Sequence, residues 1–334
     1  MAARRTNLGL LVLLTLGLVT GTVAFGVGVP GGRAVTIAHG IVGVGLVVLS
    51  PWKAAIVRRG LRRARPGRWA SVALAALVVV TVLTGVAHAA GLRALPGGLS
   101  MMQAHVGGAL ATIPLGVWHV VARPVPVRRT DLSRRSALRA GRVLTMAGLL
   151  WAAGEAAFRL GLLPGGRRRF TGSHERGTDN PTRMPVTLWL DDSVPRIDPA
   201  SWRLTVTDAR GTRLLGLGDL QADHQTRATI DCTGGWFATQ SWEGVPVRRL
   251  IVDPGDARSL VVVSHTGYAR RLPLRDLDTL LLATHIAGAP LSAGHGFPAR
   301  LVAPGRRGFW WVKWVTDIRA DPLPWWAQPP FPLT

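Results

Sequence analysis

Four long apolar runs in the first half of the 334-residue chain restrict its fold more than any other feature. They lie at about 8–29, 34–57, 70–92 and 101–122. Each has roughly the 20 residues that an α-helix needs to cross the hydrocarbon core of a bilayer. A weaker run follows at about 143–163, interrupted by Glu155 and Arg159. The sequence therefore predicts an all-α transmembrane bundle of four helices, with a fifth, linking helix behind it.

Positive charge is concentrated beside these runs. The chain has 40 Lys and Arg against 18 acidic residues, a net charge of +22, and the arginines crowd into 51–69 and 122–142. Cytoplasmic loops of membrane proteins carry such an excess. With Arg4 and Arg5 also inside, five crossings place the C-terminal half on the outer, periplasmic or extracellular, side of the cell membrane. Neither basic stretch interleaves aromatic with basic residues, so the bilayer is the expected partner and nucleic acid is not.

The composition divides the chain into three parts. These are a transmembrane domain at 1–122, a basic cytoplasmic linker with the fifth helix at 123–165, and a globular domain at 166–334. From about 170, short β-type runs are separated by Gly, Pro and Asp, which predicts a β-rich α+β domain. Short helices are expected around 216–221, 245–253 and 274–285. The domain has no P-loop, no HExxH and no GxGxxG after a strand, which argues against nucleotide hydrolysis, zinc peptidase activity and nicotinamide binding.

The segment before the fifth run, SRRSALRAG at 133–141, resembles the twin-arginine export motif. Arg134 and Arg135 precede an apolar stretch, as in that motif. The twin-arginine pathway exports folded proteins whose cofactor was inserted in the cytoplasm. The alternative is that both arginines simply belong to the cytoplasmic positive charge.

Histidines in the apolar runs are candidate heme ligands, because ionisable side chains inside a bilayer are costly and mostly functional. His105 and His119 are 14 residues apart, so they share a helix face roughly 21 Å apart along the axis. This spacing is similar to that of diheme b-type cytochromes. Near the outer helix ends, His105 can pair with His39 or His88 to hold one heme b. The alternative is that these histidines only cap helices or form hydrogen bonds between them.

Cys232 is the only cysteine, which excludes an intrachain disulfide and a cysteine-based zinc site. It can be a buried inert thiol, a nucleophile or a single thiolate ligand to a metal. Its segment, IDCTGGWFATQSWEGVPVRRLI, resembles the sulfite oxidase family, and so does 268–318, with LLLATHIAGAPL, HGFPARLVAPG and VKWV. The family includes the bacterial periplasmic methionine sulfoxide reductase. The helical half is similar to the b-type cytochrome bundles that accompany some of these enzymes.

The resemblance implies a sulfite oxidase-like fold, a molybdopterin cofactor and oxidoreductase activity. By position, Cys232 is the thiolate that coordinates molybdenum, and a soft ligand suits that metal. Arg300 corresponds to the arginine that binds the pterin phosphate, and Lys313 to the lysine that lines the same pocket. His295 and His174 occupy positions that bind the pterin in relatives.

One departure from the family bears on the substrate. Sulfite oxidases follow their cysteine with an arginine-bearing segment that binds sulfite, whereas no basic residue follows Cys232 before Arg248. We therefore expect a membrane-anchored enzyme that transfers an oxygen atom, with S-oxide reduction favoured and electrons exchanged with a quinone or another redox partner. Tyr268 and Trp236 are candidates for facing the small-molecule substrate. Two alternatives are oxidation of a small anion with a soluble electron partner, and a non-catalytic membrane protein that uses the fold for binding.

Overall fold

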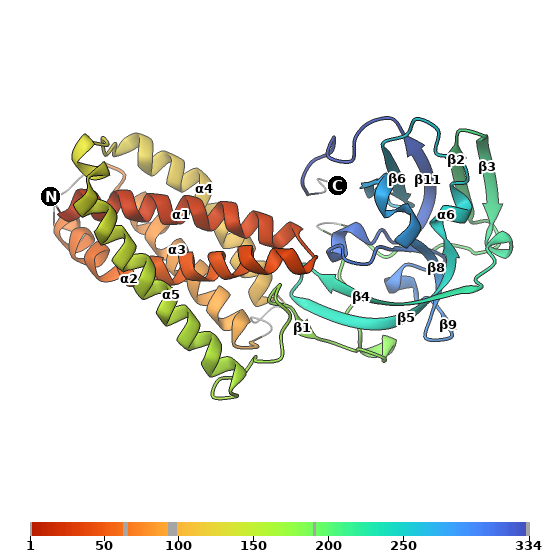
Figure 1. Cartoon of the computed structure of the whole chain (residues 1–334), viewed down its shortest axis with the longest axis horizontal. Helices are drawn as coiled ribbons and strands as arrows, with labels where there is room; N and C mark the ends of the chain where they lie inside the picture. Colours follow the sequence, from red (N-terminus) through yellow and green to blue (C-terminus); the bar gives the residue numbers. More distant parts are fainter. Residues whose placement is uncertain (1, 63–65, 93–98, 190–191, 332–334) are drawn as a thin grey trace. The chain divides into compact units, whose positions relative to one another are not determined.

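The computed structural model describes residues 2–62, 66–92, 99–189 and 192–331. The chain divides into two compact units, which Figure 1 shows as a bundle of helices and a strand-rich body. The helical unit comprises Met1–Phe25 and Pro30–His174. The strand-rich unit comprises Gly26–Val29 and Glu175–Thr334.

Among the described residues, five long helices build the helical unit. They are α1 (Ala2–Gly26), α2 (Arg33–Leu61), α3 (Arg68–Ala89), α4 (Met101–Ala122) and α5 (Arg134–Arg159). The first four are long and apolar enough to cross a membrane, with windows of mean hydropathy between 1.3 and 2.4. The linking helix also forms, but it begins at Arg134 and includes four arginines ahead of its apolar stretch. It is not among the helices that qualify as candidate membrane spans.

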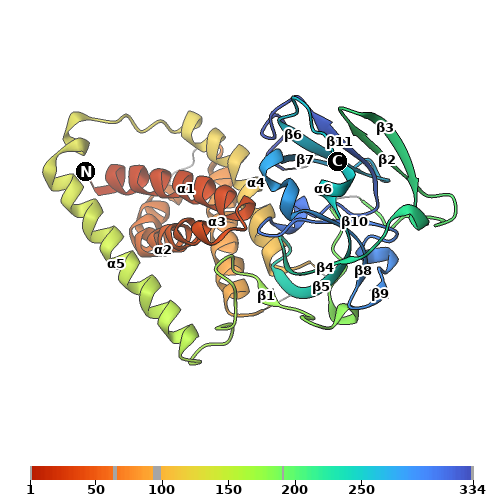
Figure 2. The ribbon, with the colours of Figure 1, turned by 45° about the vertical axis from the view of Figure 1, so that its right-hand side comes forward.

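The helices approach one another closely where glycines face larger side chains. α3 packs against α4, and α2 packs against α5, which runs beside it in Figure 2. A Cβ on Gly108 of α4 would lie 2.5 Å from Oγ1 of Thr81 of α3. A Cβ on Gly40 of α2 would lie 2.4 Å from Nε1 of Trp151 of α5. Small residues at these positions therefore set the spacing of the helices.

Two β-sheets form in the described part of the strand-rich unit (Figures 1 and 2). One has the order β1-β5-β8-β10, with β4 paired to β5 and β9 to β8, and the other has the order β3-β2-β11-β6-β7. The strands are β1 (His174–Glu175), β2 (Arg203–Asp208), β3 (Gly211–Gly216), β4 (His224–Cys232), β5 (Trp236–Pro246), β6 (Ser259–Ser264), β7 (Ala269–Pro273), β8 (Leu281–Ile286), β9 (Ala289–Pro290), β10 (Arg300–Val302) and β11 (Val315–Asp321). The short helices are α6 (Val247–Leu250) and the 3-10 turns η1 (Pro30–Gly32), η2 (Arg129–Leu132), η3 (Pro181–Arg183), η4 (Leu217–Asp219), η5 (Leu274–Thr279), η6 (Ala293–His295) and η7 (Gly308–Trp310).

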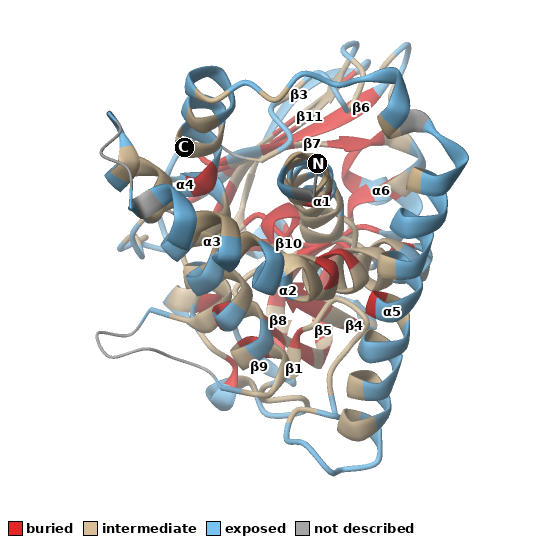
Figure 3. Cartoon of the chain, turned by 90° about the vertical axis from the view of Figure 1, so that its left-hand side faces the viewer, coloured by how far each residue is buried: buried red, intermediate tan, exposed pale blue. Residues whose placement is uncertain are grey.

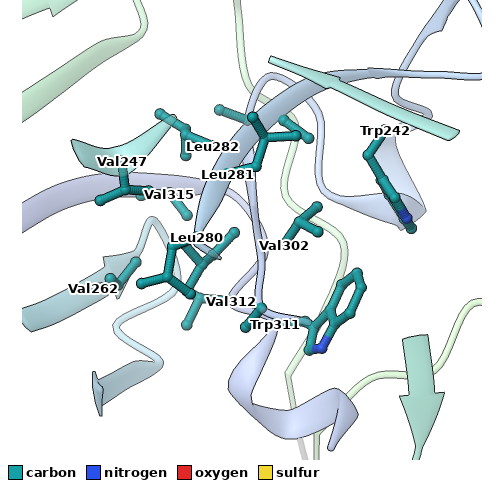
Figure 4. Packing of buried hydrophobic residues seen from close by; sticks show 14 of the residues in the cluster. Trp242, Val247, Val262, Leu280, Leu281, Leu282, Val302, Trp311, Val312 and Val315 are labelled. Carbon is teal, nitrogen blue, oxygen red and sulfur yellow. The ribbon is translucent and has the colours of Figure 1, made fainter. Parts of the chain in front are cut away.

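The hydrophobic core of this unit draws on both sheets. Successive side chains of a strand face opposite sides. Trp236, Ala238 and Trp242 of β5 are two and four positions apart, so they face the same side, and all three are buried. Figure 4 shows Trp242 near Trp311, with Leu281, Leu282 and Val302 close by. Figure 3 shows that buried residues gather in the strands, whereas the long helices are mostly half-buried or exposed. The strand-rich unit therefore buries its apolar side chains within itself, and the long helices leave theirs at the surface.

The helix expected over 274–285 is wrong in its second half. Leu274–Thr279 is the 3-10 turn η5, but Leu281–Ile286 is strand β8, which pairs with β5 and β10. Nearly all of β8 is buried, and an apolar run buried on both faces has no alternation that distinguishes a strand from a helix. The other two expected short helices correspond to η4 and α6.

Candidate active site

Cys232 lies at the end of β4, where the chain turns into β5. The turn closes with a hydrogen bond from the Gly235 N–H to the Cys232 carbonyl (3.1 Å), and Gly235 has a φ of 89°, which favours glycine. The Cys232 Sγ accepts a hydrogen bond from the Gly234 N–H at 3.3 Å. Burial raises the pKa of the thiol, while the Gly234 N–H and the charges of Arg307 and Lys313 oppose that rise. The two glycines therefore form a tight turn that begins at Cys232 and holds its buried sulfur beside the Gly234 N–H.

A pocket opens beside this sulfur. Its open volume is about 500 Å³, including space in contact with solvent. Aromatic side chains dominate its wall, including Trp189, Tyr268, Phe309, Trp311 and Trp314. Polar lining residues include Thr187, Asp192, Thr233 and Lys313. The pocket therefore presents one thiol, one ammonium and one carboxylate in a largely apolar setting.

Arg300, at the start of β10, is almost completely buried. It donates hydrogen bonds to the carbonyl oxygens of His295 (3.0 Å) and Trp311 (3.4 Å). No hydrogen-bond acceptor among the described residues reaches its Nε. Burial lowers the pKa of Arg300 to about 10, so the guanidinium stays protonated at neutral pH. A buried cation with a free N–H is chemically matched to a phosphate or another anion.

Lys313 lies next to this arginine because a glycine allows the chain to fold closely there. Gly296 has a φ of 112°, and a Cβ on it would lie 2.8 Å from the Arg300 Cβ and 3.3 Å from the Lys313 Cβ. The Lys313 Nζ donates to the carbonyl oxygens of Gly294 (2.6 Å) and Thr187 (3.1 Å). Burial, and then the charge of Arg300, lower the pKa of Lys313 to about 7. The two cations that were expected to bind the pterin are thus held together in the structure.

The two histidines expected at the pterin lie in different surroundings. His295 is buried in η6, where Nε2 donates to the Met184 carbonyl (3.1 Å) and Nδ1 accepts from the Ser292 hydroxyl (2.9 Å). Burial, followed by the nearby cations, lowers the pKa of His295 to about 4, so its ring is neutral at pH 7. His174 belongs to the helical unit, and its Nε2 donates to the His88 carbonyl at 2.8 Å. A pterin contact for either ring stays a prediction.

The structure adds site residues that the sequence did not single out. Asp231 and Arg307 form a buried ion pair directly beside Cys232, and Asp192 lines the pocket. In the sequence, the only sign of the Asp231–Arg307 pair is that an acidic residue, Asp231, directly precedes the cysteine. Of the two aromatic candidates, Tyr268 lines the pocket and donates its hydroxyl to the Phe309 carbonyl. Trp236 donates its ring N–H to the Thr187 hydroxyl at 2.9 Å.

Among the described residues, two pairs of histidine rings contact one another in the helical unit. The centroids of His39 (α2) and His105 (α4) lie 5.9 Å apart, with the rings at 81°. Those of His88 (α3) and His174 lie 5.2 Å apart. His119 (α4) contacts no other histidine ring among the described residues; it lies beside the Trp118 ring and 3.1 Å from the Ser71 hydroxyl. His105 therefore makes a direct ring contact with His39, which is one of its two expected partners.

Comparisons with known proteins define the class of this chain. Residues 191–324 match the family described as "Oxidoreductase molybdopterin binding domain". Mitochondrial sulfite oxidase of Mus musculus is 30% identical over 166 residues, which cover 38% of this chain and 30% of that protein. The uncharacterized oxidoreductase YuiH of Bacillus subtilis is 30% identical over 162 residues, which cover 43% of this chain and 82% of that protein. The sulfane dehydrogenase SoxCD from Paracoccus pantotrophus is a structural neighbour at 23% identity, with a TM-score of 0.36, covering 39% of this chain and 40% of that one.

The chain belongs to the family of oxidoreductases with a molybdopterin-binding domain. More narrowly, it is a sulfite oxidase-like, molybdopterin-dependent oxidoreductase whose strand-rich unit carries the matched region. The expected family, fold class and enzyme class are confirmed. The chain spans about a third of the length of the curated sulfite oxidases that it matches.

The residues in the pocket wall and directly behind it fit the cofactor that this family implies. Arg300 offers a buried N–H without an acceptor among the described residues, as a phosphate site requires. Cys232 offers one soft sulfur at the pocket wall, which suits a redox metal of this kind. Lys313 adds a second cation beside the first, hydrogen-bonded only to carbonyl oxygens in the described part of the chain.

Proposed function

We propose that this protein is a membrane-anchored oxidoreductase that transfers an oxygen atom at its molybdenum centre, reducing an S-oxide on the outer side of the membrane. Cys232 binds the metal, Arg300 and Lys313 bind the phosphate end of the pterin, and His295 and His174 are its further contacts. When bound, the cofactor supplies two-electron redox chemistry and exchange of one oxygen atom. Two electrons and two protons convert the S-oxide to a sulfide and water, which balances the reaction.

The side chains that line the pocket favour a neutral S-oxide over a small anion as the substrate. Its charged lining residues in the described part of the chain are Asp192 and Lys313, and no arginine is among them. A small anion such as sulfite would meet a carboxylate and a single ammonium that already donates to two carbonyl oxygens. A neutral molecule with an apolar group would instead bury that group against Trp189 and Phe309. Oxidation of a small anion with a soluble electron partner is the alternative.

The hydrogen bonds of the membrane histidines support a heme b between His39 and His105. The His105 Nδ1 donates to the Thr81 carbonyl at 2.7 Å, and the His39 Nδ1 donates to the Thr20 hydroxyl at 3.2 Å. Metal-bound histidines usually donate their second ring N–H in this way, which leaves Nε2 for the metal. In His88 it is Nε2 that donates a hydrogen bond, to the Gly172 carbonyl, so this nitrogen is not left for a metal. These contacts favour His39 over His88 as the second ligand.

Glycines provide space beside the same two rings. A Cβ on Gly21 of α1 would lie 3.0 Å from the His39 Cε1, and a Cβ on Gly85 of α3 would lie 2.8 Å from the His105 Nδ1. Both rings therefore occupy space that a side chain at these positions would fill, so the glycines permit the rings to lie where they do. In the proposal, this heme exchanges electrons with a quinone or another redox partner.

The proposed outer side requires α5 to cross the bilayer as a fifth span, and the distribution of charge supports this orientation. The ends of α2 and α4 and the starts of α1 and α5 carry the arginines of the predicted cytoplasmic side, and the Arg4 side chain pairs with Asp131 there. Arg134 and Arg135 lie in the first turn of α5. We propose that they form an export signal for the folded unit C-terminal to them; the alternative is that they only add to the cytoplasmic positive charge.

Metal and heme analysis of the detergent-purified protein tests the proposal. We expect about one molybdenum and one heme b per chain. Cys232→Ala should lose molybdenum and keep heme. His105→Ala and His39→Ala should lose heme and keep molybdenum, whereas His119→Ala should keep both. Molybdenum without heme would restrict the helices to anchoring, and a parent protein without molybdenum would favour the non-catalytic alternative.

Activity assays with artificial partners decide between the substrates. Reduced viologen with an aryl methyl sulfoxide should support turnover, and sulfite with ferricyanide should not. The reverse result would favour oxidation of a small anion.

A further inference from the structure

A buried ion pair stands directly beside the cysteine. Asp231 and Arg307 are each 2% exposed, and their side chains form an ion pair although 76 residues separate them in the sequence. By comparison, the ion pairs of Arg4 with Asp131, Arg271 with Asp321 and Arg306 with Asp276 each have at least one markedly more exposed side chain. Arg307 directly precedes η7, whose first residues, Gly308 and Phe309, line the pocket. The pair therefore joins the strand that ends in Cys232 to a turn that lines the same pocket.

Two backbone contacts strengthen this join. The Arg307 Nη2 donates to the Cys232 carbonyl at 3.3 Å, so the same guanidinium binds the Asp231 carboxylate and the backbone of the cysteine. Asp231 and Arg307 also form an isolated parallel β-bridge. The next residue, Gly308, lies so close that a Cβ on it would be 3.0 Å from the Cys232 Cα. Two successive positions of one segment thus contact two successive positions of the other.

The energetics of such a pair point to positioning. A buried ion pair contributes little net stability, because desolvation of both charges offsets their attraction, and apolar replacements are often as stable. A planar guanidinium, however, has fixed donor directions and can bind a carboxylate and a carbonyl at one defined geometry. The preceding residue, Arg306, also forms an ion pair, with Asp276 at 2.6 Å, but both side chains of that pair are more exposed than those of the Asp231–Arg307 pair.

We propose that the Asp231–Arg307 pair is a positioning device that fixes the backbone of Cys232 and hence the direction in which its sulfur enters the pocket. Asp231 and Arg307 act through Cys232 and are positioning residues. The role toward molybdenum rests on the proposed function, whereas the positioning of the thiol does not. The two parts can therefore be tested separately.

Because Cys232 is the only thiol, its alkylation reports on one site. The test uses full-length, detergent-purified protein from a host that cannot make molybdopterin, with a maleimide as the probe. Arg307→Met should speed alkylation by about tenfold or more, since local opening that was suppressed becomes populated. The matched control Arg306→Met should stay within about twofold of the parent protein. Equal rates in all three proteins would overturn the proposal.

A double variant separates positioning from simple loss of stability. Removing both charges in Asp231→Leu with Arg307→Met avoids an unpaired buried charge, so the thermal midpoint should return close to that of the parent. Alkylation should nevertheless stay fast, because the contact with the Cys232 carbonyl is gone. If the rate instead returns to the parent value together with the midpoint, the pair is structural and the proposal fails.

The cofactor-loaded protein provides the second readout. The sulfur-to-molybdenum charge-transfer absorption should shift in the double variant and remain unchanged in Arg306→Met. An unchanged spectrum in the double variant would overturn the role toward the metal. If the parent protein binds no molybdenum, the proposed function fails, and the alkylation series still decides the positioning of the thiol.

Discussion

The guanidinium carbon of Arg300 lies 5.2 Å from the ring centroid of Trp242 and 5.8 Å from that of Trp311. The side chain is 1% exposed, and its hydrogen bonds to described residues go to carbonyl oxygens. Ring faces and carbonyl dipoles lower the penalty of burying a cation without neutralising it. The site is therefore suited to receive an anion, and the proposed role of Arg300 in cofactor binding can be measured.

Arg300→Lys should weaken cofactor binding while keeping the charge. An ammonium is a point charge and cannot reproduce the planar fork that binds a phosphate at two positions. We expect the dissociation constant of the cofactor to rise by about tenfold or more, which corresponds to about 1.4 kcal/mol. Molybdenum per chain after extensive dialysis measures this, with Arg306→Lys as the control. Full retention by Arg300→Lys would show that Arg300 does not bind the cofactor.

Lys313→Met should stabilise the cofactor-free protein at neutral pH and reduce its retention of molybdenum. Burial lowers the pKa of Lys313 to about 7 from an ordinary 10.5. Between these values the unfolded chain binds more protons than the folded one, so the parent protein gains stability as pH rises from about 7 to about 10. The variant should lack this gain. Thermal unfolding of both proteins across that pH range checks the sign, and an identical pH dependence would contradict the assignment.

Gly308→Ala should disturb the cysteine strand. Its Cβ would lie 3.0 Å from the Cys232 Cα and 3.4 Å from the Asp231 carbonyl oxygen, both backbone atoms of a paired strand. Overpacking of this kind costs about 1–3 kcal/mol. Gly218→Ala is the matched control, because nothing lies within 4 Å of its Cβ position. Urea titration followed by tryptophan fluorescence measures the difference, and equal stabilities of the two variants would refute the contact.

Asp208→Asn should remove part of the stability at neutral pH but not in acid. Burial raises the pKa of this carboxyl, but the N–H groups of Arg210, Asp253 and Val252 outweigh that effect and lower it below 3.8. A lowered folded pKa contributes stability above the unfolded value, and this stability is lost as pH falls through the folded one. We expect a loss of about 2 kcal/mol at pH 7. The loss should shrink below about pH 4 in urea titrations, and a constant difference down to pH 2 would contradict this.

The sequence alone predicts those parts of the fold and of the site that depend on a single physical requirement. Helix α1 to α4 were predictable because crossing hydrocarbon needs about 20 apolar residues in a row. Cys232 was found because it is the only sulfhydryl and lies in a motif of fixed spacing. The grouping of Arg300 with Lys313 followed from the same motif, and the structure shows the glycine that permits it.

Elsewhere the decisive contacts are not local. The apolar run of β8 has no alternation, so its sequence does not distinguish a strand from a helix. The pairing of Asp231 with Arg307 depends on two segments that meet only in the folded sheet, so no spacing rule reveals it. His174 was assigned from a motif position, whereas its contacts with His88 depend on the fold of the helical unit.

The order of strands has a consequence for biosynthesis. β11 lies between β2 and β6, pairing parallel with one and antiparallel with the other, while β2–β3 and β6–β7 are hairpins of neighbouring segments. Until Val315–Asp321 has left the ribosome, the two hairpins have no strand to join them. Lys313, two residues earlier, emerges at nearly the same moment. Assembly of the pocket therefore waits for this late segment, so that loading of the cofactor follows the synthesis of the unit.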